Sequence, residues 1–122
     1  MAWELKSDRP IYIQLVEEIK LRIITGVYSP GEKIPAVREL ASEAEVNPNT
    51  MQRALAELEE SGLVITHRTT GRMVTNETDV ILNEKNNTAK EVIIEFLKKM
   101  DTLGFNKKET LEFIKREIKE DE

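Results

Sequence analysis

Two short amphipathic segments joined by a tight turn constrain the fold of this 122-residue chain more than any other feature. Apolar residues at helical spacing predict one helix over residues 36–44 and another over about residues 48–61. Asn47 can cap the second helix, Pro48 suits its first turn, and Gly62 can end it. Two helices with only a short turn between them predict a helix-turn-helix.

A small β-hairpin is predicted directly after these two segments. The runs at residues 63–68 and 72–75 contain β-branched residues, and Thr69, Thr70 and Gly71 between them favour a turn. A helix-turn-helix followed by such a hairpin describes a winged helix-turn-helix unit. We therefore expect a mainly α fold with a small β wing.

A further helix is predicted upstream, over about residues 10–25. Its apolar residues recur at helical spacing, which places them on one face of the helix. They are Tyr12, Leu15, Val16, Ile19 and Ile23. Ser7 or Asp8 can cap this helix, Pro10 suits its first turn, and Gly26 can end it. Trp3, ahead of it, is expected at the edge of the domain or at a dimer seam.

The remaining residues, 76–122, are predicted to form a helical region distinct from residues 1–75. Residues 79–103 form either one helix or two, because Asn86 and Asn87 are weak points and Thr88 with Glu91 can form a capping box. A final helix is predicted after Asn106, which can form a second capping box with Glu109.

This helical tail carries more apolar surface than one neighbouring helix can cover. We expect a homodimer in which four helices share one core. The alternative is a tail that folds back on its own wing domain. The expected dimer interface consists of Val92, Ile93, Phe96, Leu97, Met100, Leu111 and Ile114.

Composition excludes several classes of function. The chain has no cysteine, which rules out disulfides and thiolate metal sites, and a single histidine, His67, which gives little support for any metal site. We find no Ser/His/Asp set and no phosphate-cradling glycine loop, so we expect neither an enzyme nor a cofactor. The net charge of −5, taken alone, argues mildly against a nucleic-acid partner.

The sequence also lacks signals for export or membrane insertion. Residues 1–4 do not begin a secretory signal, and no apolar run approaches the roughly 18–20 residues of a membrane span. We therefore expect a cytoplasmic protein with no membrane partner.

Several linked motifs resemble the GntR family of bacterial transcription regulators. These are residues 34–41 (IPAVRELA), 46–55 (VNPNTMQRAL), 57–59 and 62–63, with Gly26 and Gly31 also in the family's positions. The resemblance covers about residues 10–75. Residues 47–50 and the short helical tail resemble the YtrA-type subfamily. That implies a repressor without a large effector domain, dimerised through its C-terminal helices, which acts on an operon such as one encoding an ABC transporter.

The chain departs from the family pattern at three points. Ala36 stands where the family usually has serine, and Pro48 stands where many branches have arginine. The wing sequence, residues 68–74, contains a single glycine, Gly71, so we expect Arg68 and Arg72 to supply part of its attraction for DNA.

The resemblance implies that the helix over residues 48–61 enters the major groove of an operator. Gln52 can bond an adenine edge, and Arg53 can bond guanine or hold a phosphate. Asn49 and Thr50 lie where a helix N-terminus favours phosphate. The candidate DNA-binding residues are Arg38, Asn47, Asn49, Thr50, Gln52, Arg53, His67, Arg68, Thr69, Thr70, Gly71 and Arg72.

These expectations leave open a different class of function and the identity of any effector. A winged helix can serve as a protein-interaction adaptor without specific DNA binding, and an adaptor would expose apolar residues on the second helix and the wing. We expect instead a basic face on which several cations gather, with most acidic residues behind it. These cations are Lys33, Arg38, Arg53, Arg68 and Arg72. The sequence does not identify a small-molecule effector, which could bind between the tail and the wing domain or at the dimer interface. The glutamates at positions 57, 59 and 60 are expected to form a solvated helix end.

Overall fold

The computed structural model describes residues 3–121. The expectation that residues 1–4 do not begin a secretory signal falls partly on Met1 and Ala2, which lie outside the described residues. The element order is α1 (Ile11–Ile24), α2 (Val37–Ala44), α3 (Pro48–Glu60), β1 (Val64–His67), β2 (Gly71–Val74), α4 (Thr78–Thr102) and α5 (Lys107–Asp121). The chain divides into two compact units between Glu84 and Lys85.

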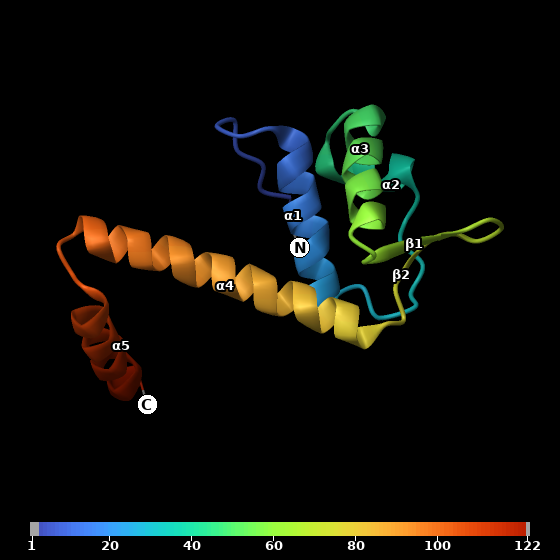
Figure 1. Ribbon diagram of the computed structural model, residues 1–122. Coiled ribbons are helices and arrows are strands. Elements are labelled where there is room, and N and C mark those ends of the chain that lie inside the picture. The colour runs from blue at the N-terminus through green and yellow to red at the C-terminus, as the bar shows by residue number, and fades with distance from the viewer. Residues whose placement is uncertain (1–2, 122) are drawn as a thin grey trace. The chain divides into compact units, whose positions relative to one another are not determined.

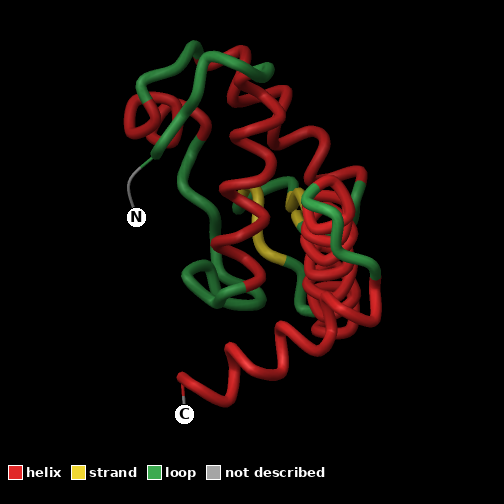
Figure 2. Tube along the Cα trace, turned by 90° about the vertical axis from the view of Figure 1, so that its left-hand side faces the viewer, coloured by secondary structure: helices red, strands yellow, loops and turns green. Residues whose placement is uncertain are grey.

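In the first unit α1, α2 and α3 pack together and the β1–β2 hairpin projects from them (Figure 1). Figure 2 shows how short the strands are beside the helices. The apolar stripes of all three helices and the base of the hairpin supply one core, because each stripe can leave water only against the others. Its fully buried members are Leu15, Ile19, Leu40, Met51, Ala54, Leu55 and Leu63. The prediction of a mainly helical winged helix-turn-helix is confirmed.

α1 begins differently from the prediction. Pro10 is its N-cap rather than a first-turn residue, and no side chain caps the helix, so the expectation of a Ser7 or Asp8 cap is wrong. The buried Gln14 instead joins the preceding segment to the helix. Its Oε1 accepts from the Lys6 N–H at 2.7 Å, and its Nε2 donates to the Lys6 and Arg9 carbonyls at 2.7 and 3.0 Å.

A buried arginine, Arg22, lies near the C-terminal end of α1. Its guanidinium lies over the Trp3 ring, 4.2 Å from the centroid, and donates to Glu18 and to the Tyr28 hydroxyl, each at 3.0 Å. Burial works against the charge, but the bonds to Tyr28 and Glu18 outweigh it and the pKa of Arg22 is raised. Trp3 therefore packs at the edge of the domain, the first of the two places expected for it.

The turn between α2 and α3 forms as the sequence predicts. Glu45 ends α2 in the left-handed conformation, with φ of 58°. Asn47 is the N-cap of α3, where its Oδ1 accepts from the Asn49 N–H at 2.8 Å, and Pro48 opens the helix. This short connection fixes the direction in which α3 leaves α2.

The hairpin pairs residue for residue from Val64 with Val74 to His67 with Gly71. Lys33 forms an isolated bridge to Met73, and the Ile34 N–H donates to the Arg72 carbonyl at 2.9 Å. The segment before α2 thereby attaches the hairpin along one edge.

α4 is a single continuous helix, so the alternative of a restart at Thr88 is wrong. Its first turns belong to the first unit, where Val80 and Ile81 pack against the core and Lys20 pairs with Glu84 at 3.5 Å. The functional division expected between residues 75 and 76 stays a prediction.

The second unit consists of the remainder of α4 and α5. The predicted capping box before α5 is confirmed, since the Asn106 N–H donates to Glu109 and the Glu109 N–H donates back to Asn106 Oδ1. Phe105 meets Phe113 edge to face, with the ring centroids 5.8 Å apart. Across residues 3–121, no helix combines the length and the apolar character that a membrane crossing requires.

We predict that Gln14→Ala lowers the free energy of unfolding by about 1–3 kcal/mol, because two backbone carbonyls and one N–H lose a buried partner. Urea denaturation of the full chain measures the change. The matched control is Gln52→Ala on α3, whose exposed side chain makes no hydrogen bond within residues 3–121, so its effect should stay within about 0.5 kcal/mol. Equal effects of the two substitutions would contradict an anchoring role for Gln14.

Candidate nucleic-acid interface

One face of α3 is a polar surface held outward by the core. Met51, Ala54, Leu55 and Leu58 are almost completely buried on the opposite face. The helical period therefore forces Asn49, Gln52 and Arg53 to point away from the core, and all three are exposed. Amide and guanidinium groups on one exposed helical face can read the donors and acceptors of base edges.

The first turn of α3 carries polar side chains at the positive end of the helix dipole. Asn47 uses its side-chain oxygen for the cap, which leaves its amide N–H groups as possible donors to an outside acceptor. Asn49 is exposed and Thr50 is half-buried at the same end. The positive end of the helix dipole at this end of α3 favours a phosphate group.

Arg38 lies on the first turn of α2, where it is exposed and makes no ion pair within the described chain. Val37 is half-buried and Leu40 is buried, so Arg38 belongs to the outer side of α2, together with other exposed polar residues. An unpaired guanidinium on a fixed helix can bond phosphate oxygens.

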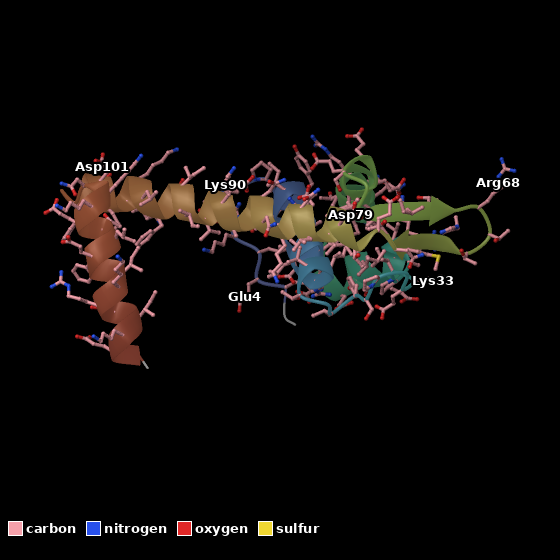
Figure 3. The ribbon with its side chains drawn as sticks, turned by 60° about the horizontal axis from the view of Figure 1, so that its bottom comes forward. Glu4, Lys33, Arg68, Asp79, Lys90 and Asp101 are labelled. Atoms are coloured by element: carbon pink, nitrogen blue, oxygen red, sulfur yellow. The ribbon has the colours of Figure 1, made fainter. Side chains whose placement is uncertain are left out.

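The hairpin and the segment before α2 enclose a groove of about 570 Å³. Figure 3 shows Arg68 at the far end of the hairpin, its side chain pointing outward, and Lys33 nearer the body of the unit. The groove brings together most of the predicted wing residues with Lys33. From the hairpin it is lined by Thr66, Arg68, Thr69, Thr70, Gly71 and Arg72. Two exposed cations, Lys33 and Arg68, thus border a hollow large enough for a phosphate.

His67 is not part of this groove. Residues along a strand alternate between its two faces, and His67 lines a different hollow with Ile65 and Met73. Any contact of His67 with DNA would have to come from the other face of the hairpin. Residues 3–121 hold no cluster of His, Asp or Glu that could bind a metal ion.

Arg72 differs most from its expected role as a free wing cation. Its Nε donates to Glu59 Oε1 near the end of α3, and both side chains are partly buried. The expectation that Glu59 belongs to a solvated helix end is wrong, because this carboxylate pairs with the hairpin. The pair joins β2 to α3 and uses one donor of a guanidinium that the sequence suggested was available to DNA.

The partner of Arg53 was not predicted from the sequence. The Arg53 guanidinium lies over the Tyr12 ring of α1, 3.5 Å from its centroid. Helical spacing assigned Tyr12 to the apolar face of α1, and it is half-buried there. A tyrosine at the edge of an apolar stripe is the only local signal for such a contact.

The tail residues expected at a dimer interface lie on α4 and α5 in the second unit. Val92, Ile93 and Leu111 are 64%, 55% and 52% exposed, and Phe96 is 39% exposed. Leu97, Met100 and Ile114 are half-buried. The two helices therefore leave much of their apolar surface in contact with water, which is costly for a stable monomer.

Comparison with known proteins identifies related sequences. The family model described as bacterial regulatory proteins, gntR family, matches residues 11–74. The uncharacterized HTH-type transcriptional regulator YhcF of Bacillus subtilis is 38% identical over 112 residues, which are 92% of this chain and 93% of that protein. The HTH-type transcriptional repressor YtrA of B. subtilis is 38% identical over 79 residues, 65% of this chain and 61% of the relative.

Solved structures agree with these sequence matches. A GntR family transcriptional regulator from Listeria monocytogenes superposes with a TM-score of 0.84 and 41% identity, covering 92% of this chain and 98% of that one. AraR(DBD) in complex with operator ORX1 superposes with a TM-score of 0.56 and 28% identity, covering 62% of this chain and 99% of the other.

We predict that Glu59 and Arg72 stabilise each other by about 0.5–1 kcal/mol in a double-mutant cycle built from Glu59→Ala and Arg72→Ala, because partial burial reduces solvent screening. Urea denaturation of the four proteins gives the coupling. The same cycle on Arg9 and Glu17, a pair 46% and 53% exposed, is the control and should give a smaller value. A coupling of zero between Glu59 and Arg72 would show that the pair does not tie the hairpin to α3.

Proposed function

Because the chain belongs to the gntR family of bacterial regulatory proteins, we propose that it represses transcription by binding a two-fold symmetric operator as a homodimer. The chain is a DNA-binding regulator of transcription and not an enzyme. Its relatives include a YtrA repressor, which supports the YtrA-type subfamily. A protein that acts on a bacterial operator works in the cytoplasm, which is the location we propose.

The observation that carries the proposal is the polarity of the exposed face of α3. A protein-interaction adaptor would present apolar side chains there, whereas this helix presents Asn49, Gln52 and Arg53. We assign base reading to Gln52 and Arg53 in the major groove, and phosphate contacts to Arg38 and the first turn of α3. AraR(DBD), which covers 62% of this chain, is bound to its operator in the solved structure.

The hairpin completes the proposed surface. Arg68 and Lys33 are exposed beside the groove, and Thr69 and Thr70 lie at its tip. We assign these residues to the phosphates and the minor groove next to the major-groove site, with Gly71 allowing the tight turn at φ of 88°. Arg72 contributes mainly by holding the hairpin against α3.

The exposed apolar side chains of the second unit support dimerisation. A second copy of the chain would cover Val92, Ile93, Phe96 and Leu111 with the same residues of its own, as a two-fold interface requires. Dimerisation places two copies of α3 on one DNA molecule. Half-sites roughly 34–36 Å apart, or a multiple of that distance, would then bind both copies. The regulated operon that we propose is one that encodes an ABC transporter.

The direct test of the function uses the DNA upstream of the chain's own gene and a duplex selected from random-sequence DNA by the wild-type protein. A specific complex at about 150 mM salt that survives excess non-specific competitor is expected. Failure to retain any sequence from the random pool, by a protein that is folded and dimeric, would favour the adaptor and contradict the proposal.

We predict that Gln52→Ala and Arg38→Ala weaken operator binding in different ways. Gln52→Ala should cost about 1–3 kcal/mol and relax discrimination at one base pair of each half-site, since a base-edge contact is lost. Arg38→Ala should weaken binding to all sequences and reduce the salt dependence by about one counterion per lost phosphate contact. Fluorescence anisotropy on the selected duplex and its base-pair variants separates the two. Loss of discrimination with Arg38→Ala alone would reverse our assignment.

We also predict that Ile93→Glu shifts the protein toward monomer by at least about tenfold in dissociation constant, because a charge would be buried in the apolar interface. Sedimentation velocity across a concentration series measures the shift. Lys90→Glu, which changes an exposed residue of the same helix, is the control and should leave the association constant within about threefold. A wild-type chain that stays monomeric at high concentration would instead favour a tail folded on its own wing domain.

A further inference from the structure

We propose that Tyr12 is a positioning residue for DNA reading, because its ring holds the Arg53 guanidinium in place on the outer face of α3. The inference rests on the proposed function, in which Arg53 contacts DNA. Tyr12 thereby gives α1 a role in DNA recognition. Neither the sequence motifs nor the proposed base contacts had involved this helix.

The geometry of the pair is close and links two helices. Arg53 Cζ lies 3.5 Å from the centroid of the Tyr12 ring, a distance at which the flat guanidinium rests against the ring. By comparison, Arg116 lies 5.4 Å from the ring of Phe113, and both belong to α5. The Tyr12–Arg53 contact is tighter and is made between elements that the core packs together.

Within the part of the chain that the structure describes, Arg53 has an aromatic partner but no carboxylate partner. Arg22 also lies on an aromatic ring, yet it is buried and paired with Glu18, so its charge is used within the fold. Arg53 is exposed and makes no ion pair within residues 3–121. An aromatic ring covers one face of a guanidinium and leaves the N–H donors at its edge free. Arg53 is therefore held in place while its charge and its donors remain available.

Such a hold matters most for a bidentate contact. A guanidinium that bonds two acceptors of one base must lie in a defined plane, and a long free side chain loses rotamer freedom when it adopts that plane. A ring that already defines the plane reduces this loss on binding. Tyr12 can do so because α1 is fixed nearby, with Leu15 fully buried and Gln14 bonded to the preceding segment.

The experiment measures affinity for the selected operator duplex and for a scrambled duplex, with thermal unfolding of each variant as a folding control. Tyr12→Leu removes the ring, and Tyr12→Met is a second variant if the leucine does not fold. Either should weaken operator binding about three- to tenfold and scrambled-duplex binding by less than about twofold. Tyr12→Phe keeps the ring without the hydroxyl and should retain operator affinity within about twofold.

Coupling to Arg53 separates positioning from a general structural effect. In an Arg53→Ala background, Tyr12→Leu should change operator affinity by less than about twofold, because there is no guanidinium left to hold. Arg53→Lys should lose affinity as Tyr12→Leu does, since an ammonium keeps the charge but has no flat face.

Two results would overturn the inference while leaving the proposed function intact. One is that Tyr12→Leu binds the operator duplex as tightly as the wild type, although Arg53→Ala binds it more weakly. The other is an equal loss from Tyr12→Leu with and without Arg53. A wild-type protein with no preference for any duplex would overturn the proposed function itself, and this inference with it.

Discussion

The packing of α1 against α3 is the constraint on which the rest of the structure depends. A single core takes Leu15 and Ile19 from α1 and Leu55 and Leu58 from α3, all with 1% or less of their surface exposed. Because a core of this density tolerates little rotation of either helix, it fixes which face of α3 meets water. The polar face that we assign to base reading is thus a consequence of the apolar one, and Tyr12 meets Arg53 at the edge of the same contact.

Total charge is a poor guide to the partner of this chain. The net charge of −5 averages over residues with different tasks. Glu18 and Glu43 lie by the buried Arg22, and Glu59 pairs with Arg72, so these carboxylates are occupied within the fold. Lys33, Arg38 and Arg68 remain exposed without an ion pair in the described part of the chain. Arrangement, rather than the sum of charges, provides a surface for an anionic partner.

The sequence predicted those parts of the fold that depend on local chemistry. Asn47 with Pro48, and Asn106 with Glu109, mark helix starts because a cap is made by residues a few positions apart. It failed where a partner is distant in the chain. Gln14 anchors backbone eight residues away in place of a cap, Arg72 pairs with Glu59 thirteen residues back, and Arg53 meets Tyr12 from another helix. The continuity of α4 through Asn86 and Asn87 likewise overrides a plausible local restart, since helix interiors tolerate such residues at small cost.

The most direct measurement of the central claim is a hydroxyl-radical footprint of the wild-type dimer on the selected duplex at about 150 mM salt. Two recognition surfaces related by a two-fold axis predict two equal sets of protected sugars, with centres one helical turn or a multiple of it apart and on one face of the DNA. Protection at a single half-site, or uniform protection without a preferred register, would contradict an operator-binding dimer that reads sequence through α3.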